Sequence, residues 1–389
     1  MKTASIQPAD RIQKVSEYYF SEKLQEIRVM NQSGEEVINL GIGNPDGMPA
    51  PEVIDTLSET SHDHRNHGYQ PYSGLPELKT AFANWYRKFF QVELNPENQI
   101  LPLIGSKEGI MHISMAFLNP GDGVLVPNPG YPAYAAVSNL LEARIHSYEL
   151  EEERNWQPDL KKLEKEGLKR IKLMWVNYPN MPTGQAADPD FFNELIAFGS
   201  RNNILIVNDN PYSFILNDSP ISLLSAPEAM DCALELNSLS KSQNMAGWRM
   251  GMLAGKAEFI QYVLRVKSNM DSGQFKPMQL AAVKALELDE NWYKEINKRY
   301  RNRRKLIWEL FDHIGCKYSK NQNGMFVWAS IPDSQNNAKD FAENILQRSR
   351  VFISPGFIFG SKGNRFIRAS LCQPAEIITK AIERLKTND

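Results

Sequence analysis

The sequence predicts an α/β fold in which helices flank a mostly parallel sheet, together with a smaller α+β domain. From about residue 100 onward, short apolar runs alternate with helical patterns, as in parallel strands connected by helices. Reactive side chains occupy the loops after these runs, and ligands of open α/β sheets bind at the carboxyl ends of strands. A chain of 389 residues also exceeds the size at which one hydrophobic core stops growing. Two domains are therefore expected.

The composition is that of a water-soluble globular protein, with 42% hydrophobic and 23% charged residues. A formal net charge of −2 predicts neither a nucleic-acid partner nor an anionic membrane partner. No apolar run approaches the ~20 residues of a membrane span, and the first ten residues lack the apolar segment of a signal peptide. The three distant cysteines, Cys232, Cys316 and Cys372, are typical of reduced thiols. These features predict a cytoplasmic protein.

The N-terminal part precedes the regular alternation. Residues 1–36 are polar, and an apolar stripe within residues 15–29 predicts a helical arm that covers another surface, such as a partner subunit. The stripe consists of Val15, Tyr18, Tyr19, Leu24 and Ile27. Residues 37–42 predict a strand, and residues 43–47 form a tight loop in which glycine lets the backbone approach a ligand. Helices are expected over residues 51–60 and 76–90.

The central part predicts the strands of the large sheet and the helices between them. Strands are expected at residues 100–104, 124–126, 145–148, 171–176, 204–208 and 232–236, and helices at 105–117, 190–200 and 258–267. A long helical region, residues 278–313, leads into the smaller domain. There, strands are expected at 324–331, 351–354 and 365–371, and helices at 338–348 and 374–386. The predicted division is an arm that contributes to the small domain (1–36), a large domain (37–276) and a small C-terminal domain (277–389).

Three histidines, His62, His64 and His67, lie within six residues and could bind a metal ion. They precede a turn, lack the i, i+4 spacing of a helical metal site and alternate with polar residues. A solvated loop explains them better, and no metal site is predicted.

A lysine, an arginine and several serines gather in the loop after the strand at residues 232–236. The amine of Lys241 is a good nucleophile towards an aldehyde if burial or a neighbouring cation lowers its pKa. Arg249 supplies a cation whose planar fork suits a phosphate, and Ser238 and Ser240 add uncharged donors. This combination suggests a phosphorylated aldehyde cofactor, pyridoxal 5′-phosphate, attached to the lysine. The alternative is a solvated turn that happens to carry these charges.

Several motifs then follow one another in a fixed order. They are Tyr69, Gly105-Ser106-Lys107, Asn128 to Tyr131, Asn177 to Gly184, Asp209 to Tyr212, Ser238 to Lys241 with Gly247 to Arg249, and Arg368 to Ser370. This order resembles that of the class I/II aminotransferases, which belong to the fold-type I pyridoxal-phosphate-dependent enzymes. The resemblance extends from about residue 37 to the C-terminus and is far more specific for fold and cofactor than for substrate.

The resemblance implies roles at the cofactor ring. Lys241 would form a Schiff base with the cofactor and later move a proton between substrate and cofactor carbons. Asp209 would pair with the protonated pyridine nitrogen, although an aspartate at a strand's end is often a helix cap. Asn180 and Tyr212 would hydrogen-bond the phenolic oxygen of the ring. Tyr131 would stack on the ring, and core packing is the alternative explanation.

The resemblance also implies a phosphate site that two subunits share. Tyr69 would reach the phosphate from the second subunit, so that the protein would be a homodimer with shared active sites. The remaining phosphate contacts would come from Ser106, the backbone of Lys107, Ser238, Ser240 and Arg249.

Arg368 would bind the α-carboxylate of the substrate through two parallel hydrogen bonds, which lysine cannot reproduce. Arg365 is the rival, and an arginine on a surface strand is the alternative; the position of Ser370 favours Arg368. Lys107 falls where some relatives bind an acidic substrate side chain, which hints at a dicarboxylic or polar substrate. The predicted substrate contacts are Arg368, Asn180, Gly43 and Lys107.

Two motifs depart from the usual pattern. The motif Asn-Pro-x-Asn-Pro-Thr-Gly is replaced by Asn-Tyr-Pro-Asn-Met-Pro-Thr-Gly from Asn177 to Gly184, which is expected to retain Asn180 as the ring contact. Asn210 stands where an acidic residue is common. The segments from Gly41 to Asp46 and from Gly105 to Gly109 are similar to those of the LL-diaminopimelate aminotransferase branch.

The implied function is transfer of an amino group between an L-amino acid and a 2-oxo acid by a ping-pong mechanism. A C–S lyase, decarboxylase or synthase of the same fold is the alternative. A catalytically inactive, cofactor-binding regulator is disfavoured, because Lys241, Asp209 and Arg368 are all present.

Overall fold

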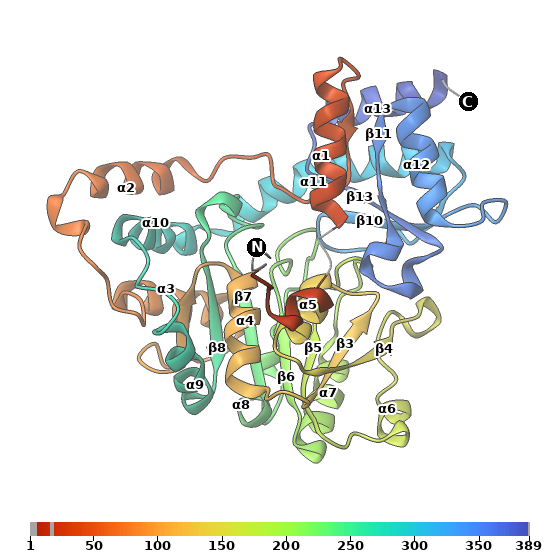
Figure 1. Ribbon diagram of the computed structural model, residues 1–389. Coiled ribbons are helices and arrows are strands. Elements are labelled where there is room, and N and C mark those ends of the chain that lie inside the picture. Colours follow the sequence, from red (N-terminus) through yellow and green to blue (C-terminus); the bar gives the residue numbers. More distant parts are fainter. Residues whose placement is uncertain (1–5, 16–18, 388–389) are drawn as a thin grey trace, which may run out of the picture.

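The computed structural model describes residues 6–15 and 19–387, and its largest element is a seven-stranded sheet (Figure 1). The strand order is β2-β8-β7-β6-β5-β3-β4. The strands are β2 (Ile100–Leu103), β3 (Gly123–Asn128), β4 (Arg144–Glu149), β5 (Ile171–Val176), β6 (Leu205–Asp209), β7 (Ala233–Ser238) and β8 (Gly251–Gly255). Neighbours pair in parallel except at β8, which runs antiparallel to both β7 and β2. The predicted mostly parallel sheet is confirmed.

Helices cover both faces of this sheet. Because successive side chains of a strand point to opposite faces, Leu173 and Trp175 of β5 pack in one apolar cluster and Met174 and Val176 in another. The first cluster contains side chains of α4 (Ser106–Phe117), α5 (Pro132–Leu140) and α9 (Ala257–Lys267). The second contains side chains of α3 (Pro76–Phe90) and α7 (Pro189–Asn202). The remaining helices of this part are α2 (Pro51–Ser61), α6 (Leu160–Glu166), α8 (Ala229–Cys232) and α10 (Lys276–Glu287).

A smaller antiparallel sheet, in the order β12-β13-β10-β9, is formed by the C-terminal part of the chain. Its strands are β9 (Lys317–Tyr318), β10 (Phe326–Ser330), β12 (Ser354–Pro355) and β13 (Phe366–Ser370). Figure 1 shows β10 and β13 among α1 (Tyr19–Gln32), α11 (Glu290–His313), α12 (Ala338–Ser349) and α13 (Ala375–Thr387). Beside them, β1 (Ile38–Asn39) pairs in parallel with β11 (Val351–Phe352). The predicted α+β arrangement of the C-terminal part is therefore observed.

The predicted N-terminal arm packs on its own chain. Phe20 and Ile27 of α1 are buried, and the Lys23 ammonium lies 2.9 Å from the Glu343 carboxylate of α12. Part of the apolar face of α1 thus covers the C-terminal part of this chain, while Leu24 and Val29 are exposed, and a contact with a partner subunit stays a prediction. Tyr18 of the predicted stripe lies outside the described residues.

Local capping rules explain most helix boundaries. Proline stands in the first turn of α2, α3, α5, α7 and α10, where its missing N–H costs no hydrogen bond. The long helical region expected at residues 278–313 consists of two helices, because the Asp289 side chain accepts hydrogen bonds from the backbone N–H groups of Asn291 and Trp292 and so begins the new helix α11.

The domain boundaries expected at residues 36 and 276 stay a prediction. Among the described helices, none is long and apolar enough to cross a membrane.

Candidate active site

A cavity of about 450 Å³ lies where the carboxyl ends of β6 and β7 meet the start of α4. Asp209 is the last residue of β6, Ser238 is the last residue of β7, and Ser106 begins α4. The predicted residues that line this cavity are Gly43, Ser106, Lys107, Tyr131, Asp209, Tyr212, Ser238, Ser240, Lys241, Arg249 and Arg368. Six segments that are separate in the sequence thus meet at one place.

The amine of Lys241 points into this cavity from the loop between β7 and β8. Its Nζ donates to the Gly43 carbonyl at 2.7 Å. Burial lowers the pKa of Lys241, and the positive charges of Arg368 and Arg249 act in the same direction. A lowered pKa increases the neutral fraction of the amine, and only the neutral amine is a nucleophile.

Asp209 is a buried carboxylate, and one of its two oxygens accepts a hydrogen bond. Oδ2 accepts from the Tyr134 hydroxyl at 3.0 Å, whereas Oδ1 is buried and accepts no hydrogen bond from the described residues. Burial raises the pKa of Asp209 to about 6, although the Tyr134 and Ser106 hydroxyls oppose this shift. Residues 211–214 form turns, so Asp209 does not act as a helix cap. The site therefore suits a positively charged N–H donor.

The residues around the start of α4 form a site that fits a phosphate-sized anion. Gly105, which precedes the helix, has φ 78°, and a Cβ there would lie 2.2 Å from Nη2 of Arg249. The Ser238 and Ser240 hydroxyls are 2.8 Å apart, and Nη1 of Arg249 lies 3.5 Å from the Ser240 hydroxyl. Helix N–H groups, hydroxyls and a guanidinium converge here, as anion sites require. We call Ser106, Ser238, Ser240 and Arg249 the phosphate site.

Arg368 lies on β13 with only 4% of its surface exposed, so it is not a surface arginine. Its Nη2 donates to the Gly41 carbonyl at 2.8 Å, and its Nη1 lies 3.0 Å from the sulfur of Met181. The rival, Arg365, does not line the cavity and donates to the Pro332 carbonyl at 3.0 Å. Of these two arginines, only Arg368 can meet a ligand in the cavity.

The predicted position of Asn180 at the cofactor ring is not what the structure shows. Its Oδ1 accepts from the Thr183 hydroxyl at 2.8 Å, its Nδ2 donates to the Asn177 carbonyl at 3.2 Å, and it does not line the cavity. Asn177 and Met181 of the same loop line the cavity instead. The reason is visible in the motif: alignment on Pro-Thr-Gly, which follows Met181, places Met181 at the second asparagine of the pattern.

Two tyrosines, Tyr69 and Tyr134, remain to be compared with the sequence-based predictions. Tyr69 is 94% exposed and does not line the cavity of its own chain, so its contact with a second subunit stays a prediction. Tyr134, which hydrogen-bonds Asp209, was not predicted. It lies one helical turn after Tyr131, and this i, i+3 spacing next to a motif is the signal that could have identified it.

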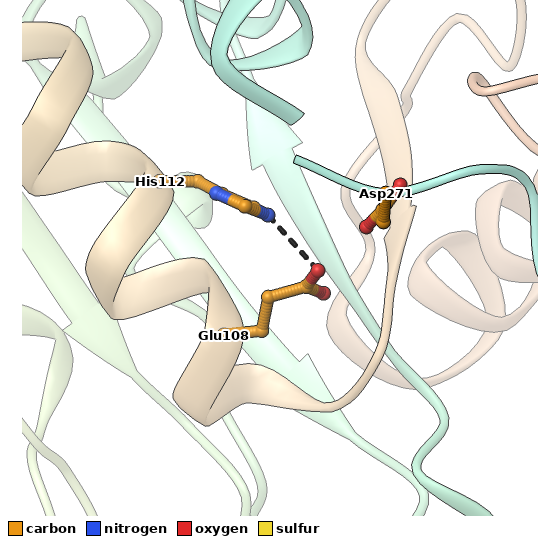
Figure 2. A group of neighbouring side chains, drawn as sticks. All are labelled: Glu108, His112 and Asp271. Atoms are coloured by element: carbon orange, nitrogen blue, oxygen red, sulfur yellow. Dashed lines mark hydrogen bonds and ion pairs between the residues drawn. The ribbon is translucent and has the colours of Figure 1, made fainter. Parts of the chain in front are cut away.

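Glu108 and His112 of α4 form a second polar cluster with Asp271 (Figure 2). Their closest oxygen and nitrogen atoms all lie within 4.8 Å of one another, and His112 Nε2 is 2.9 Å from Glu108 Oε1. The buried Lys267 ammonium lies 2.6 Å from Asp271 and already supplies a cation. The cluster is therefore better explained as an ion-pair network that joins α4 to the loop after α9 than as a metal site. His67 is not part of it and contacts the Ser61 carbonyl at 3.0 Å.

Comparison with known proteins gives a consistent result. Residues 35–385 match the family described as aminotransferase class I and II. The LL-diaminopimelate aminotransferase of Dehalococcoides mccartyi is 40% identical over 378 residues, which cover 96% of this chain and 97% of that protein. The enzyme of the same name from Aquifex aeolicus is 36% identical over 381 residues, 97% of this chain and 98% of that protein. The structure of apo-BacF from Bacillus subtilis superposes with a TM-score of 0.94 at 35% identity and covers 99% of both chains.

These relatives carry the names of aminotransferases, which favours transamination over a lyase, decarboxylase or synthase reaction. The match extends over both sheets and over every loop that lines the cavity. On this evidence the chain belongs to the class I and II aminotransferase family of pyridoxal-phosphate-dependent enzymes, and within it to the branch of the LL-diaminopimelate aminotransferases.

Proposed function

We propose that this aminotransferase acts on LL-diaminopimelate, or on an L-amino acid with a similar distal carboxylate, and passes the amino group to a 2-oxo acid. Two cationic side chains in one cavity carry this proposal. Arg368 suits the α-carboxylate, because its planar fork forms two parallel hydrogen bonds with a carboxylate. Lys107 lines the same cavity and supplies a second positive charge for a distal carboxylate. The names of the relatives point to the same substrate.

The residues of the cavity fit pyridoxal 5′-phosphate. The buried Oδ1 of Asp209 suits the protonated ring nitrogen, the phosphate site suits the phosphate, and the amine of Lys241 suits the aldehyde. Tyr131 and Tyr212 line the cavity and are proposed as ring contacts. When bound, the cofactor supplies an electron sink that stabilises negative charge on the substrate Cα.

The side chains of the protein would perform the remaining steps. Arg368 orients the substrate by its α-carboxylate, which directs the Cα–H bond towards Lys241. The Lys241 amine, with its lowered pKa, would take the proton from the substrate Cα and deliver it to the aldehyde-derived carbon of the cofactor, on the other side of the amino nitrogen. Burial of the cavity by Phe326 and Phe359 excludes water while the proton moves.

A homodimer with shared active sites is part of the proposal. The isolated bridge between Gln70 and Gly273 holds two surface segments side by side. These segments carry large exposed apolar side chains, including Tyr69 (94% exposed) and Met270 (58% exposed). A second copy of the chain would cover them and would bring Tyr69 to the partner's phosphate site. The three free cysteines are buried, and the cytoplasm is the proposed location.

The substrate proposal is tested by a half-reaction without any oxo acid. The purified yellow holoenzyme is mixed with LL-diaminopimelate or with L-lysine, which has the same skeleton without the distal carboxylate, and the visible absorbance is followed. Conversion to the pyridoxamine form at lower concentrations of LL-diaminopimelate than of L-lysine is expected. The Lys107→Met variant should remove this preference and leave the reaction with L-lysine unchanged.

Three other outcomes would contradict the proposal. An equal response to both amino acids would refute the role of the distal carboxylate. Release of pyruvate or carbon dioxide with the yellow band intact would indicate a lyase or a decarboxylase. A Lys241→Ala variant that keeps full activity would refute the assignment of the lysine.

A further inference from the structure

The segment between α9 and α10, residues 268–275, is connected to the phosphate site at two points. We call it the α9–α10 segment. At the first point, Nε2 of Gln274 donates to the Arg249 carbonyl at 3.0 Å. Arg249 has φ 55° and ψ 53°, a left-handed backbone conformation that residues with a Cβ disfavour. The hydrogen bond from Gln274 therefore stabilises the backbone conformation from which the Arg249 side chain reaches the phosphate site.

The second connection runs from Asp271 through Glu108 to the turn before α4. Oε2 of Glu108 accepts from the Ile104 N–H at 2.5 Å. A carboxylate oxygen of Asp271 lies within 4.8 Å of one of Glu108 (Figure 2). Ile104 is followed directly by Gly105 and by Ser106 of the phosphate site. Glu108 thus fixes the turn that leads into the phosphate site, and Asp271 is the neighbour of Glu108 on the α9–α10 segment.

Two carboxyl groups as close as those of Glu108 and Asp271 repel each other unless a proton lies between them. Oδ2 of Asp271 is buried and accepts no hydrogen bond from the described residues. Burial and the Glu108 carboxylate raise the pKa of Asp271, although the Lys267 ammonium at 2.6 Å opposes this shift. Burial acts against ionisation of Glu108 too, but hydrogen bonds with His112, Asp271 and the Ile104 N–H lower the pKa of Glu108 to about 2. Asp271 is therefore the member of the pair that holds a proton.

The charged groups in contact with this carboxyl pair are His112 of α4 and Lys267 of α9. Arg249 is a further cation close to the start of α4, across Gly105. The elements α5, β2 and β8, which also pack on α4, carry no charged residue. Glu235 of β7 points to the other face of the sheet, where it accepts a hydrogen bond from a tyrosine of α3. Titration of the pair is thus set by its own two carboxyl groups and these three cations.

We propose that Asp271 and Gln274 are positioning residues that set the affinity of the phosphate site for the phosphate of the cofactor. Gln274 holds the backbone of Arg249, and protonated Asp271 donates to Glu108 and holds it against the turn at Ile104. Loss of this proton leaves two carboxylates that repel each other, so the affinity for phosphate falls as the pH rises through the titration of Asp271. This inference rests on the proposed cofactor and on the proposed place of its phosphate.

The first test follows the release of pyridoxamine 5′-phosphate from holoenzyme loaded with it, at a series of pH values. This form of the cofactor is not attached covalently to Lys241, so its release reports on the other contacts. In Asp271→Asn the amide can donate to the Glu108 carboxylate at every pH, and its oxygen can accept from Lys267. Release should be similar in the two proteins at low pH. At high pH it should be about tenfold faster in the native protein, as expected for a lost hydrogen bond to a charged group.

A spectroscopic measurement separates a local change at the phosphate from a general loss of stability. The phosphorus NMR resonance of the bound cofactor should shift as the pH rises through the titration of Asp271 in the native protein. The Asp271→Asn holoenzyme should lack this step. If Asp271→Asn does not fold, Glu108→Gln removes the titration from the other member of the pair and should give the same result.

The second test concerns Gln274 and has a matched control in the same segment. Gln274→Met keeps the length of the side chain but removes the N–H donor, and it should speed release about fivefold at every pH. In the control, Asn269→Ala, release should be unchanged, because the Asn269 amide donates to the Arg265 carbonyl and not to the phosphate site.

Each outcome decides for or against the inference. The same pH dependence of release in the native protein and in Asp271→Asn would overturn the role of Asp271. Unchanged release in Gln274→Met, or equal acceleration in Asn269→Ala, would overturn the role of Gln274. A native protein that does not bind pyridoxamine 5′-phosphate would refute both the inference and the proposed cofactor. Release rates in the expected order without any preference for LL-diaminopimelate would refute the proposed substrate and leave this inference intact.

Discussion

Replacement of Asp209 by asparagine should make the cofactor-free protein more stable at neutral pH. The pKa of Asp209 rises from its ordinary value of 3.8 to about 6, because the carboxylate is buried. At about 1.4 kcal/mol for each pKa unit, the charged carboxylate destabilises the folded state by about 3 kcal/mol above pH 6. Because the folded state retains its proton to a higher pH than the unfolded state, stability falls as the pH rises from 3.8 to 6 and is constant above. The Asp209→Asn variant has no such titration.

The assay is urea unfolding of the cofactor-free protein at several pH values. The stability difference between Asp209→Asn and the native chain should grow by about 2 kcal/mol between about pH 4.5 and about pH 7.5. Asp218→Asn serves as a control, because Asp218 is at the surface and its pairing with Arg301 is exposed. A difference that does not change with pH would refute the reasoning about burial. In the holoenzyme the effect should shrink, because the ring nitrogen would neutralise the carboxylate.

Three further substitutions test the other parts of the site. Arg368→Lys should raise the half-saturating concentration of the amino acid about tenfold or more, because an ammonium group cannot form two parallel hydrogen bonds with a carboxylate. Gly105→Ala, measured by cofactor titration, should weaken binding at least about tenfold, whereas Gly247→Ala should not, because a Cβ at Gly247 meets no atom within 4 Å. Tyr134→Phe should destabilise the protein by about 1 kcal/mol and move the titration of Asp209 to higher pH, which the urea series would detect.

Much of the fold could be predicted because local rules act at most element boundaries. The helices α2 and α3 begin at Pro51 and Pro76, as expected, and the strand at residues 171–176 was predicted without error. The break between α10 and α11 was missed, because Leu288 and Asp289 interrupt no apolar pattern and only the capping hydrogen bonds reveal it. Antiparallel β8 was not predicted either, since strand direction depends on tertiary packing.

The candidate site could be predicted where a motif fixes both residue type and position. Lys241, Asp209 and Arg368 line one cavity. Asn180 was wrongly placed at this cavity, because side-chain direction within a tight loop depends on hydrogen bonds such as that of Thr183 to Asn180. Met181 was overlooked for a different reason. Alignment on Pro-Thr-Gly places Met181 at the second asparagine of the motif, but a methionine there does not resemble the expected residue type. Its contact with an arginine 187 residues away arises only in the folded chain.

The antiparallel direction of β8 affects how the loop between β7 and β8 becomes ordered. The pairing of Ser238 with Gly251 joins the two ends of the loop that carries Lys241 and Arg249. The entropy of closing this loop is therefore lost when the sheet forms, and not when a ligand binds. The chain also holds the cationic side chains of Lys241 and Arg249 in one cavity. An anion that binds between them would relieve their mutual repulsion. Part of the free energy of folding would in this way contribute to the affinity for the proposed phosphate group.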